Sequence, residues 1–240
     1  MRPIAICLSV LTGVDPLDRK RLASEGKWSD DYTNSLKGGS LKGKKLGFWT
    51  GPSGEHFKVD KVMEEAVAFF KSQGAEVIEI DKVIADGVNG ASFQVMLYEY
   101  KDGLNSYFAS LGENAATPSL EALIAFNKED SIEMSFYNQK YLEMAQEKGD
   151  LNEQAYKDAL ETMLTGTREK GIDKVMDEHQ LDAIIAITGS PAWKTDHTNG
   201  DHYMLSSSSP AAISGYPNIT VPMGFVEGLP VGISIFGRAW

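Results

Sequence analysis

The chain has 240 residues, of which 42% are hydrophobic, and this is enough material to bury a sizeable core. Its 23 basic and 34 acidic side chains give a formal net charge of −11, which argues against a basic surface for nucleic acid or an anionic membrane. The single cysteine, Cys7, excludes an internal disulfide and a cysteine-based metal site, and is typical of a reducing compartment. The longest apolar runs are about one strand long, well short of the roughly 20 residues that cross a bilayer. We therefore expect a cytoplasmic protein without nucleic-acid or membrane partners.

The first third of the chain predicts a strand–helix–strand unit that follows a short helix and a loop. A short apolar helix over 4–11 precedes a polar, irregular segment over 16–43. Strands are predicted at 44–49 and 76–80, and apolar residues at helical spacing between them predict a helix that ends near Gly74. Because a helical crossover joins the two strands, we expect them to be parallel.

The middle of the chain, from about 88 to 180, has helical periodicity throughout. Breaks are expected at Gly112, at 117–119, where Pro118 would open a helix as its first residue, and at 149–150. The apolar run 181–188 then predicts a strand that is buried on both faces.

The last fifty residues predict a loop, a short helix and a hairpin. After a loop over 189–205, Ser209 is expected to cap a helix that has Pro210 as its first residue and Gly215 at its end. Strands over 218–225 and 230–236 then flank the turn signal at 227–229. The elements together predict an α/β fold.

Two stretches of the last sixty residues contain candidate chemistry. The serine run 206–209 precedes a helix start, where it could cap the helix or face a ligand. His197 and His202 share a loop with two aspartates, which leaves metal-dependent hydrolysis as a third possibility, although an irregular loop does not force these side chains together. A Ser190–His202–Asp201 triad can be drawn on paper, but the sharp nucleophile turn that would activate the serine is absent.

Several longer segments resemble the amidase signature family, in family order and over essentially the whole chain. The more specific ones lie near the C-terminus. The segments are LTGVDP at 11–16, GAEV at 74–77, LDAIIA at 181–186, TGSPAWKTD at 188–196, NGDH at 199–202, SSSSPAAISGYPNITVPMG at 206–224 and GLPVGISIFG at 228–237.

The resemblance implies hydrolysis of carboxylic amides by a serine nucleophile, a second serine with a cis peptide bond, and a lysine base. Such a lysine must be neutral to accept a proton, and backbone N–H groups would hold the oxyanion. In the family these residues belong to a Gly-Ser-Ser-Gly-Gly-Ser segment and a lysine that precede the region resembled here. The 240 residues contain no such segment, so the resemblance assigns no catalytic residue, and it implies no cofactor and no metal.

The resemblance does imply substrate-side roles for the strand end and the serine run. The residues concerned are Gly189, Ser190, Trp193, Ser206 and Ser207. The alternative is that they only pack this part of the fold against the rest, since pocket walls and domain contacts use the same loop chemistry.

The resulting expectation is a mixed sheet of about five strands between helices, equivalent to the C-terminal part of the family's α/β/α sandwich. Residues 1–240 would form a single, partial domain that lacks the catalytic segment, with a second truncation at Trp240. Cutting a sheet exposes an edge, so self-association or a covering partner is expected. The function would be that of the C-terminal portion of an amide hydrolase, inactive alone, or that of a non-catalytic binding or interaction module.

Overall fold

The computed structural model describes residues 2–18 and 20–240, so Met1 and Arg19, the latter within the predicted loop 16–43, lie outside the described residues. The strands are β1 (Lys45–Trp49), β2 (Glu76–Ile80), β3 (Ala183–Ile187), β4 (Asn218–Val226) and β5 (Leu229–Phe236). The longer helices are α1 (Arg2–Leu11), α2 (Phe57–Ser72), α3 (Val88–Ser110), α4 (Leu120–Glu129), α7 (Gln154–Thr167) and α8 (Asp173–His179). The shorter helices and turns are η1 (Arg21–Ser24), η2 (Tyr32–Leu36), η3 (Gly112–Asn114), α5 (Glu133–Phe136), α6 (Lys140–Gln146), the π-helical turn η4 (Arg168–Ile172) and α9 (Ser209–Ser214).

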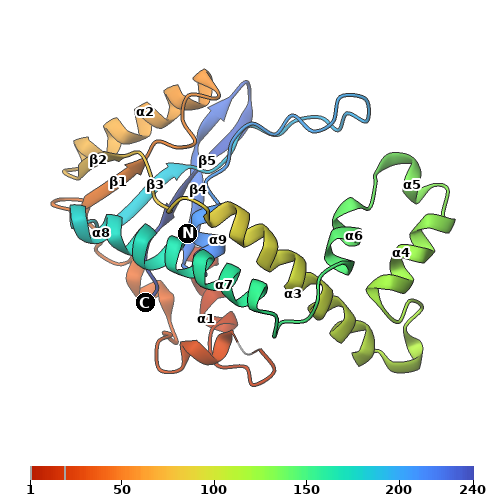
Figure 1. The fold of residues 1–240 in the computed structure, drawn as a ribbon. Helices are drawn as coiled ribbons and strands as arrows, with labels where there is room; N and C mark the ends of the chain where they lie inside the picture. Colours follow the sequence, from red (N-terminus) through yellow and green to blue (C-terminus); the bar gives the residue numbers. More distant parts are fainter. Residues whose placement is uncertain (1, 19) are drawn as a thin grey trace.

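The five strands form one mixed sheet, as predicted, and their order in it is β2-β1-β3-β5-β4 (Figure 1). β1 is parallel to both β2 and β3, whereas β5 runs antiparallel to its neighbours β3 and β4. The crossover through α2 therefore gives the parallel pair that the strand–helix–strand pattern predicts. The sheet ends at β2 on one side and at β4 on the other.

The central strand β3 is buried on both faces, as its continuous apolar run predicts. Ile185 and Ile187 pack with the underside of α2, whereas Ile184 and Ala186 pack with α8 and α9. All four side chains have no exposed surface. Because successive side chains of a strand point to opposite faces, this one five-residue strand contributes to two separate apolar cores.

The C-terminal hairpin turns on the two residues between β4 and β5. Glu227 and Gly228 have φ values of 50° and 82°, which is the left-handed pair required by the tightest hairpin turns. The strands extend one residue beyond the predicted ends on each side of this turn.

Two helix starts differ from the sequence expectation. Pro118 is not the first helical residue, because Ser119 caps α4 by accepting a 3.1 Å hydrogen bond from the Ala122 N–H. Likewise α9 begins at Ser209 rather than after it, so Ser208 occupies the cap position and Pro210 the second helical position. In both places a serine beside the proline can take the cap, and the sequence alone does not say which residue does so.

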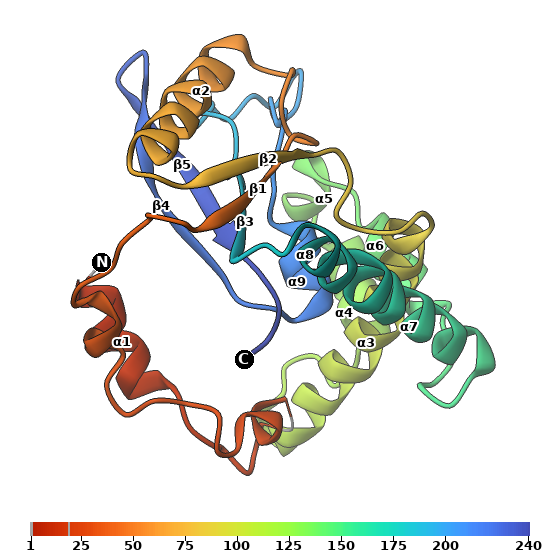
Figure 2. The ribbon, with the colours of Figure 1, turned by 90° about the vertical axis from the view of Figure 1, so that its left-hand side faces the viewer.

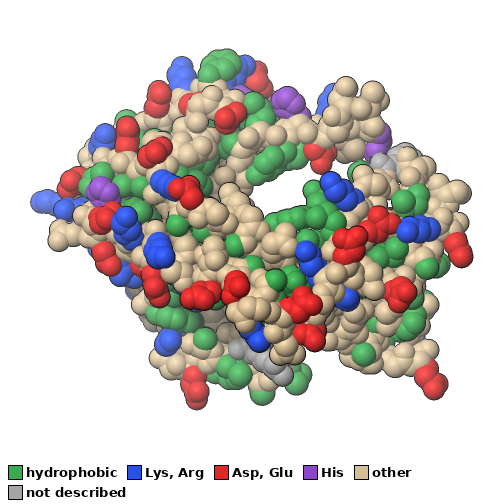
Figure 3. Space-filling model, in the orientation of Figure 1, with side chains coloured by type: hydrophobic (Ala, Val, Ile, Leu, Met, Phe, Trp, Pro, Cys, Tyr) green, Lys and Arg blue, Asp and Glu red, His purple; other side chains and the backbone are tan. Residues whose placement is uncertain are grey.

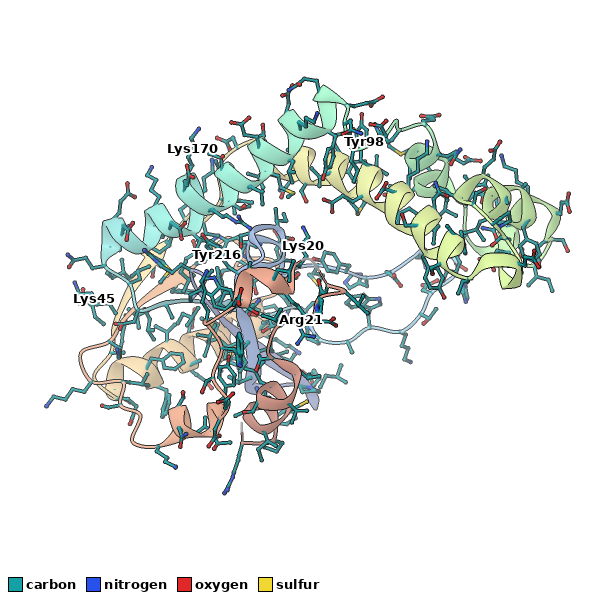
Figure 4. All side chains as sticks on the ribbon, turned by 90° about the horizontal axis from the view of Figure 1, so that it is seen from below. Lys20, Arg21, Lys45, Tyr98, Lys170 and Tyr216 are labelled. Carbon is teal, nitrogen blue, oxygen red and sulfur yellow. The ribbon has the colours of Figure 1, made fainter. Side chains whose placement is uncertain are left out.

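Residues 88–167 form a helical lobe that extends away from the sheet (Figure 1). α3 and α7 lie side by side, α4 and α6 pack against α3, and α5 contacts α4 (Figure 4). Tyr98 and Tyr156 hold the α3–α7 pair, since Tyr98 donates to Glu153 at 2.7 Å and Tyr156 donates to Glu99 at 2.9 Å. Burial and then the bond to Glu99 raise the pKa of Tyr156 to about 12.

The N-terminal segment is mostly exposed. α1 packs against η2, and Figure 2 shows it lying apart from the sheet. Ala5 is its only buried residue, whereas five of its larger apolar side chains are exposed: Ile4, Ile6, Leu8, Val10 and Leu11. None of the helices among the described residues combines the length and apolar character needed to cross a membrane.

Candidate active-site wall

Four of the five predicted site residues meet at one point beyond the carboxyl end of β3. Gly189 and Ser206 form an isolated antiparallel bridge, and the N–H of Ser207 donates to the Thr188 carbonyl at 3.2 Å. Residues 189–206 therefore leave the sheet and return to the same place. We call the loop over 189–206 the arm, and we call its base, formed by Gly189, Ser190, Ser206 and Ser207, the root. In open α/β sheets, ligands bind at the carboxyl ends of parallel strands, which is where the root lies.

Two hydroxyl groups at the root have no hydrogen-bond partner. The Oγ atoms of Ser190 and Ser207 are both inaccessible to solvent and find no partner among the described residues. Ser207 as a whole has 0% exposure. A buried hydroxyl without a partner costs about 1–3 kcal/mol, so such a group calls for a specific explanation, such as a ligand or an ordered water.

Ser206 has a different role from its two serine neighbours. Its Oγ lies 3.1 Å from Ser208 Oγ and accepts a 3.2 Å hydrogen bond from the Ser208 N–H. This local pattern fixes the turn that leads into α9. Ser206 thus stabilises the helix entry, whereas the Ser207 hydroxyl finds no partner among the described residues.

A cluster of three hydroxyls beside the root was missed by the sequence analysis. Thr188 Oγ1 lies 2.9 Å from Ser234 Oγ and 3.5 Å from Thr220 Oγ1, and Thr220 and Ser234 are 3.4 Å apart. The three residues come from the end of β3, from β4 and from β5. Thr220 and Ser234 are cross-strand partners, so a correct hairpin register would have revealed that pair. The contribution of Thr188 depends on a contact 46 residues away.

Gly232 makes room for the hydroxyl cluster. A Cβ atom at this position would lie 2.8 Å from Thr220 Cγ2 and 3.1 Å from Thr188 Oγ1. Both distances are shorter than normal packing allows. The glycine is therefore needed for close approach of the strands at this point.

Trp193, the fifth predicted residue, lies along the arm and not at the root. Its indole N–H donates to Asp201 at 3.2 Å, and its ring makes an edge contact with Tyr203. Both partners belong to the returning half of the arm, so Trp193 joins the two halves. The prediction that it shares one site with the serines holds only if a ligand extends along the arm.

The tip of the arm is a tight turn built on Asp196. Its carboxylate accepts hydrogen bonds from the N–H groups of Thr198 and Asn199 at 2.8 and 2.9 Å, and from the Asn199 side chain at 2.8 Å. The bond from the Asn199 side chain, followed by the two backbone bonds, lowers the pKa of Asp196. The Asp196 carboxylate thus stabilises the turn through the hydrogen bonds that it accepts.

The geometry of this loop supports neither the triad drawn on paper nor the metal site considered above. Asp201, a member of the triad drawn on paper, accepts its hydrogen bond from Trp193. His197 lies beside Tyr137 of the helical lobe, with ring centroids 6.4 Å apart. Among residues 2–18 and 20–240 there is no group of three or more histidine, cysteine or acidic side chains placed to hold a metal ion.

Comparison with known proteins gives one consistent family. The family described as Amidase matches residues 1–240. The chain is 30% identical over 239 residues to a probable amidase of Arabidopsis thaliana, and the match covers 96% of this chain and 42% of that protein. It is 26% identical to one of the subunits of the glutamyl-tRNA(Gln) amidotransferase of Desulfotalea psychrophila, over 97% of this chain and 48% of that protein.

Solved structures agree with the sequence matches. The native peptide amidase of Stenotrophomonas maltophilia is 32% identical and superposes with a TM-score of 0.88, over 98% of this chain and 47% of that one. A peptide amidase in complex with the competitive inhibitor chymostatin is 34% identical, with a TM-score of 0.91, over 98% and 48% of the two chains. The chain thus spans about half the length of the proteins it matches. Together, the profile match over all 240 residues and the shared fold show that this chain belongs to the amidase signature family.

Proposed function

We propose that this chain forms one wall of the substrate pocket of an amide hydrolase, with the nucleophile and the base supplied from outside the 240 residues. The buried hydroxyls of Ser190 and Ser207, which find no partner among the described residues, carry the proposal, and a substrate would reach them when the backbone of the arm shifts. A carboxamide has both a donor and an acceptor, so it can satisfy hydroxyl groups that have no other partner. The likeness to peptide amidases at 32–34% identity favours peptide amides as the substrate class.

The other predicted residues have supporting roles in this proposal. Gly189 and Ser206 hold the root together through their bridge, and Trp193 lines the path away from it. The chain alone would bind an amide without cleaving it, because its sequence contains no Gly-Ser-Ser-Gly-Gly-Ser segment. We also treat residues 1–240 as one partial domain of a larger amidase fold.

An assembly partner is part of the same proposal. The edge strand β4 and the exposed apolar residues of α1 leave hydrogen-bonding groups and apolar surface uncovered. Because the chain matches about half of each related protein, the partner that fits best is the complementary half of an amidase fold. An unpaired edge strand and an apolar face are surfaces that folded proteins normally cover.

Substitution of Ser207 tests the pocket. If its hydroxyl has no partner, Ser207→Ala leaves the free energy of unfolding unchanged or raises it by up to about 1 kcal/mol, while weakening the binding of an amide about tenfold. The measurement is the thermal shift of the chain in a titration with acetamide and benzamide. Binding that is the same in the variant and the native chain would contradict the proposed role of Ser207.

Ser110→Ala is the matched control. Ser110 Oγ donates to the Tyr107 carbonyl at 2.7 Å near the end of α3, away from the root. Its removal should leave amide binding unchanged. If no amide and no carboxylic acid stabilises the native chain, the pocket proposal fails and a non-catalytic interaction module becomes the better description.

A further inference from the structure

The helical lobe contains a hollow that the amidase comparison does not assign. It has a volume of about 200 Å³. Its lining residues are Asn127, Glu133, Met134, Tyr137, Asn138, Gln139, Tyr141 and Leu142. A cavity of about 150 Å³ can hold benzene, so a hollow of this size can hold one aromatic side chain. We call it the lobe pocket.

The chemistry of the lobe pocket favours a neutral peptide with a large apolar side chain. Met134, Leu142 and the two tyrosines supply apolar surface, and the described residues that line the pocket include no lysine or arginine. The remaining lining groups are three carboxamides and one carboxylate. Side-chain carboxamides pair readily with the N–H and C=O groups of a peptide backbone.

The carboxamides at the base of the pocket are held in place. Gln139 is 6% exposed, and its Nε2 donates to the Ile124 carbonyl at 3.2 Å. Its Oε1 accepts a 3.3 Å hydrogen bond from Asn127 Nδ2. The pocket therefore has a fixed polar base under walls that include the exposed rings of Tyr137 and Tyr141.

The arm connects this pocket with the root. The ring of His197, at the arm tip, makes an edge contact with the ring of Tyr137, which is 67% exposed and lines the lobe pocket. Figure 3 shows an opening through the molecule between the arm, the helical lobe and the sheet. Trp193 and Tyr203 place two further exposed rings along the arm. Aromatic surface is thus present from the middle of the arm to the lobe pocket.

The length of the arm limits the distance that a ligand using both ends must cover. Seven residues, 190–196, lead from the root to the tip, and an extended chain of that length spans at most roughly 23 Å at 3.3 Å per residue. An extended peptide of about six or seven residues is long enough to cover this upper limit.

We propose that the lobe pocket binds an apolar or aromatic side chain near the amino end of an extended peptide, up to about six residues before the terminal amide that lies at the root. The inference rests on the proposed function for the position of that amide. The binding of the side chain in the lobe pocket does not depend on the proposed function, since the lobe binds that side chain whatever group ends the peptide.

The test compares blocked hexapeptide amides by isothermal titration calorimetry with the native 240-residue chain. One peptide has phenylalanine at its amino end and glycine and serine elsewhere, a second has glycine in place of that phenylalanine, and a third has the phenylalanine next to the amide. The first peptide should bind about tenfold more tightly than the second, because only its ring reaches the pocket. Tyr137→Ala should abolish most of that difference without changing the affinity for the second peptide.

Phe69→Ala is the control variant. Phe69 is an exposed ring that packs beside Phe70 on α2, on the far side of the sheet from the helical lobe (Figure 1). This variant should keep the tenfold preference. Equal affinities of the first two peptides for the native chain would overturn the proposal, and so would equal losses in the two variants. A larger effect of Tyr137→Ala on the third peptide than on the first would also overturn it.

A fourth peptide separates this inference from the proposed function. It has the sequence of the first peptide but ends in a carboxylate. If the two termini bind equally well while the preference for phenylalanine still depends on Tyr137, the lobe pocket stands and the amide site at the root fails. If the terminal amide is preferred but phenylalanine is not, the lobe pocket fails and the amide site stands.

Discussion

At the scale of single residues, the root of the arm depends on small side chains that allow close approach. The Gly189–Ser206 bridge lies beside Ser190 and Ser207, whose hydroxyls find no partner among the described residues. Beside them, Gly232 lets Thr188, Thr220 and Ser234 gather within hydrogen-bonding range. Adding a side chain at Gly232 should therefore destabilise the fold more than removing one of these hydroxyl groups.

Gly232→Ala is expected to destabilise the chain by about 1–3 kcal/mol, since the new methyl group would meet Thr220 Cγ2 and Thr188 Oγ1 inside normal contact distance. Urea unfolding followed by circular dichroism measures the change. Gly103→Ala is the comparison, because Gly103 lies inside α3 with open space around its Cβ position. That variant should gain about 0.5–1 kcal/mol from helix propensity, and a loss of the same size in both variants would contradict the packing argument.

At the scale of elements, α1 is a helix whose apolar surface exceeds what its neighbours cover. It packs on η2, while Val10 is 79% exposed. An apolar helix face that stays uncovered is a site of association. The assembly proposal therefore makes a specific statement about this helix.

Val10→Asp should lower the self-association of the isolated chain and its binding of a hydrophobic dye, because it places a charge on the exposed apolar surface. Light scattering over a range of protein concentrations and dye fluorescence measure the two effects. Ile132→Asp changes a similarly exposed apolar residue in the helical lobe and should have a smaller effect. A native chain that is monomeric at every concentration and binds no dye would contradict the proposal.

Most elements could be predicted from the sequence because their signals are local. Helical spacing between residues 59 and 70 and the continuous apolar run of β3 each determine one structure, and the order of these elements predicts the mixed sheet. The helix starts were wrong by one or two residues, since more than one residue beside the proline can take the cap: Ser119 follows Pro118 at α4, and Ser208 and Ser209 precede Pro210 at α9.

The parts of the candidate site that the sequence does not predict depend on contacts between distant segments. The edge contact between His197 and Tyr137 joins residues 60 positions apart in the sequence, and no periodicity predicts it. The same is true of the hydroxyl cluster, which requires the register of β3, β4 and β5 together. The serine run 206–209 is singled out by its place before a helix start, whereas the substrate-side roles of Ser190 and Ser207 are implied only by the family resemblance.

At the scale of the whole molecule, an α/β core and a helical lobe are connected by the arm, whose tip contacts the lobe through His197 and Tyr137. The proposal places the chemistry that breaks an amide bond outside these 240 residues. Purified chain should accordingly release no ammonia from a panel of simple amides above the rate of buffer alone. Ammonia release that is abolished by substitution of any serine within the chain would contradict the proposal, and an enzymatic ammonia assay is sensitive enough to decide.

The burial of β3 on both faces has a mechanical consequence for the arm. β3 is paired on both edges and packed on both faces, so the carboxyl end from which the arm departs is held rigidly. Any displacement of the arm tip must then come from backbone rotation within residues 190–205. Whatever position the tip adopts above the lobe, the serines at its base keep a constant position relative to the sheet.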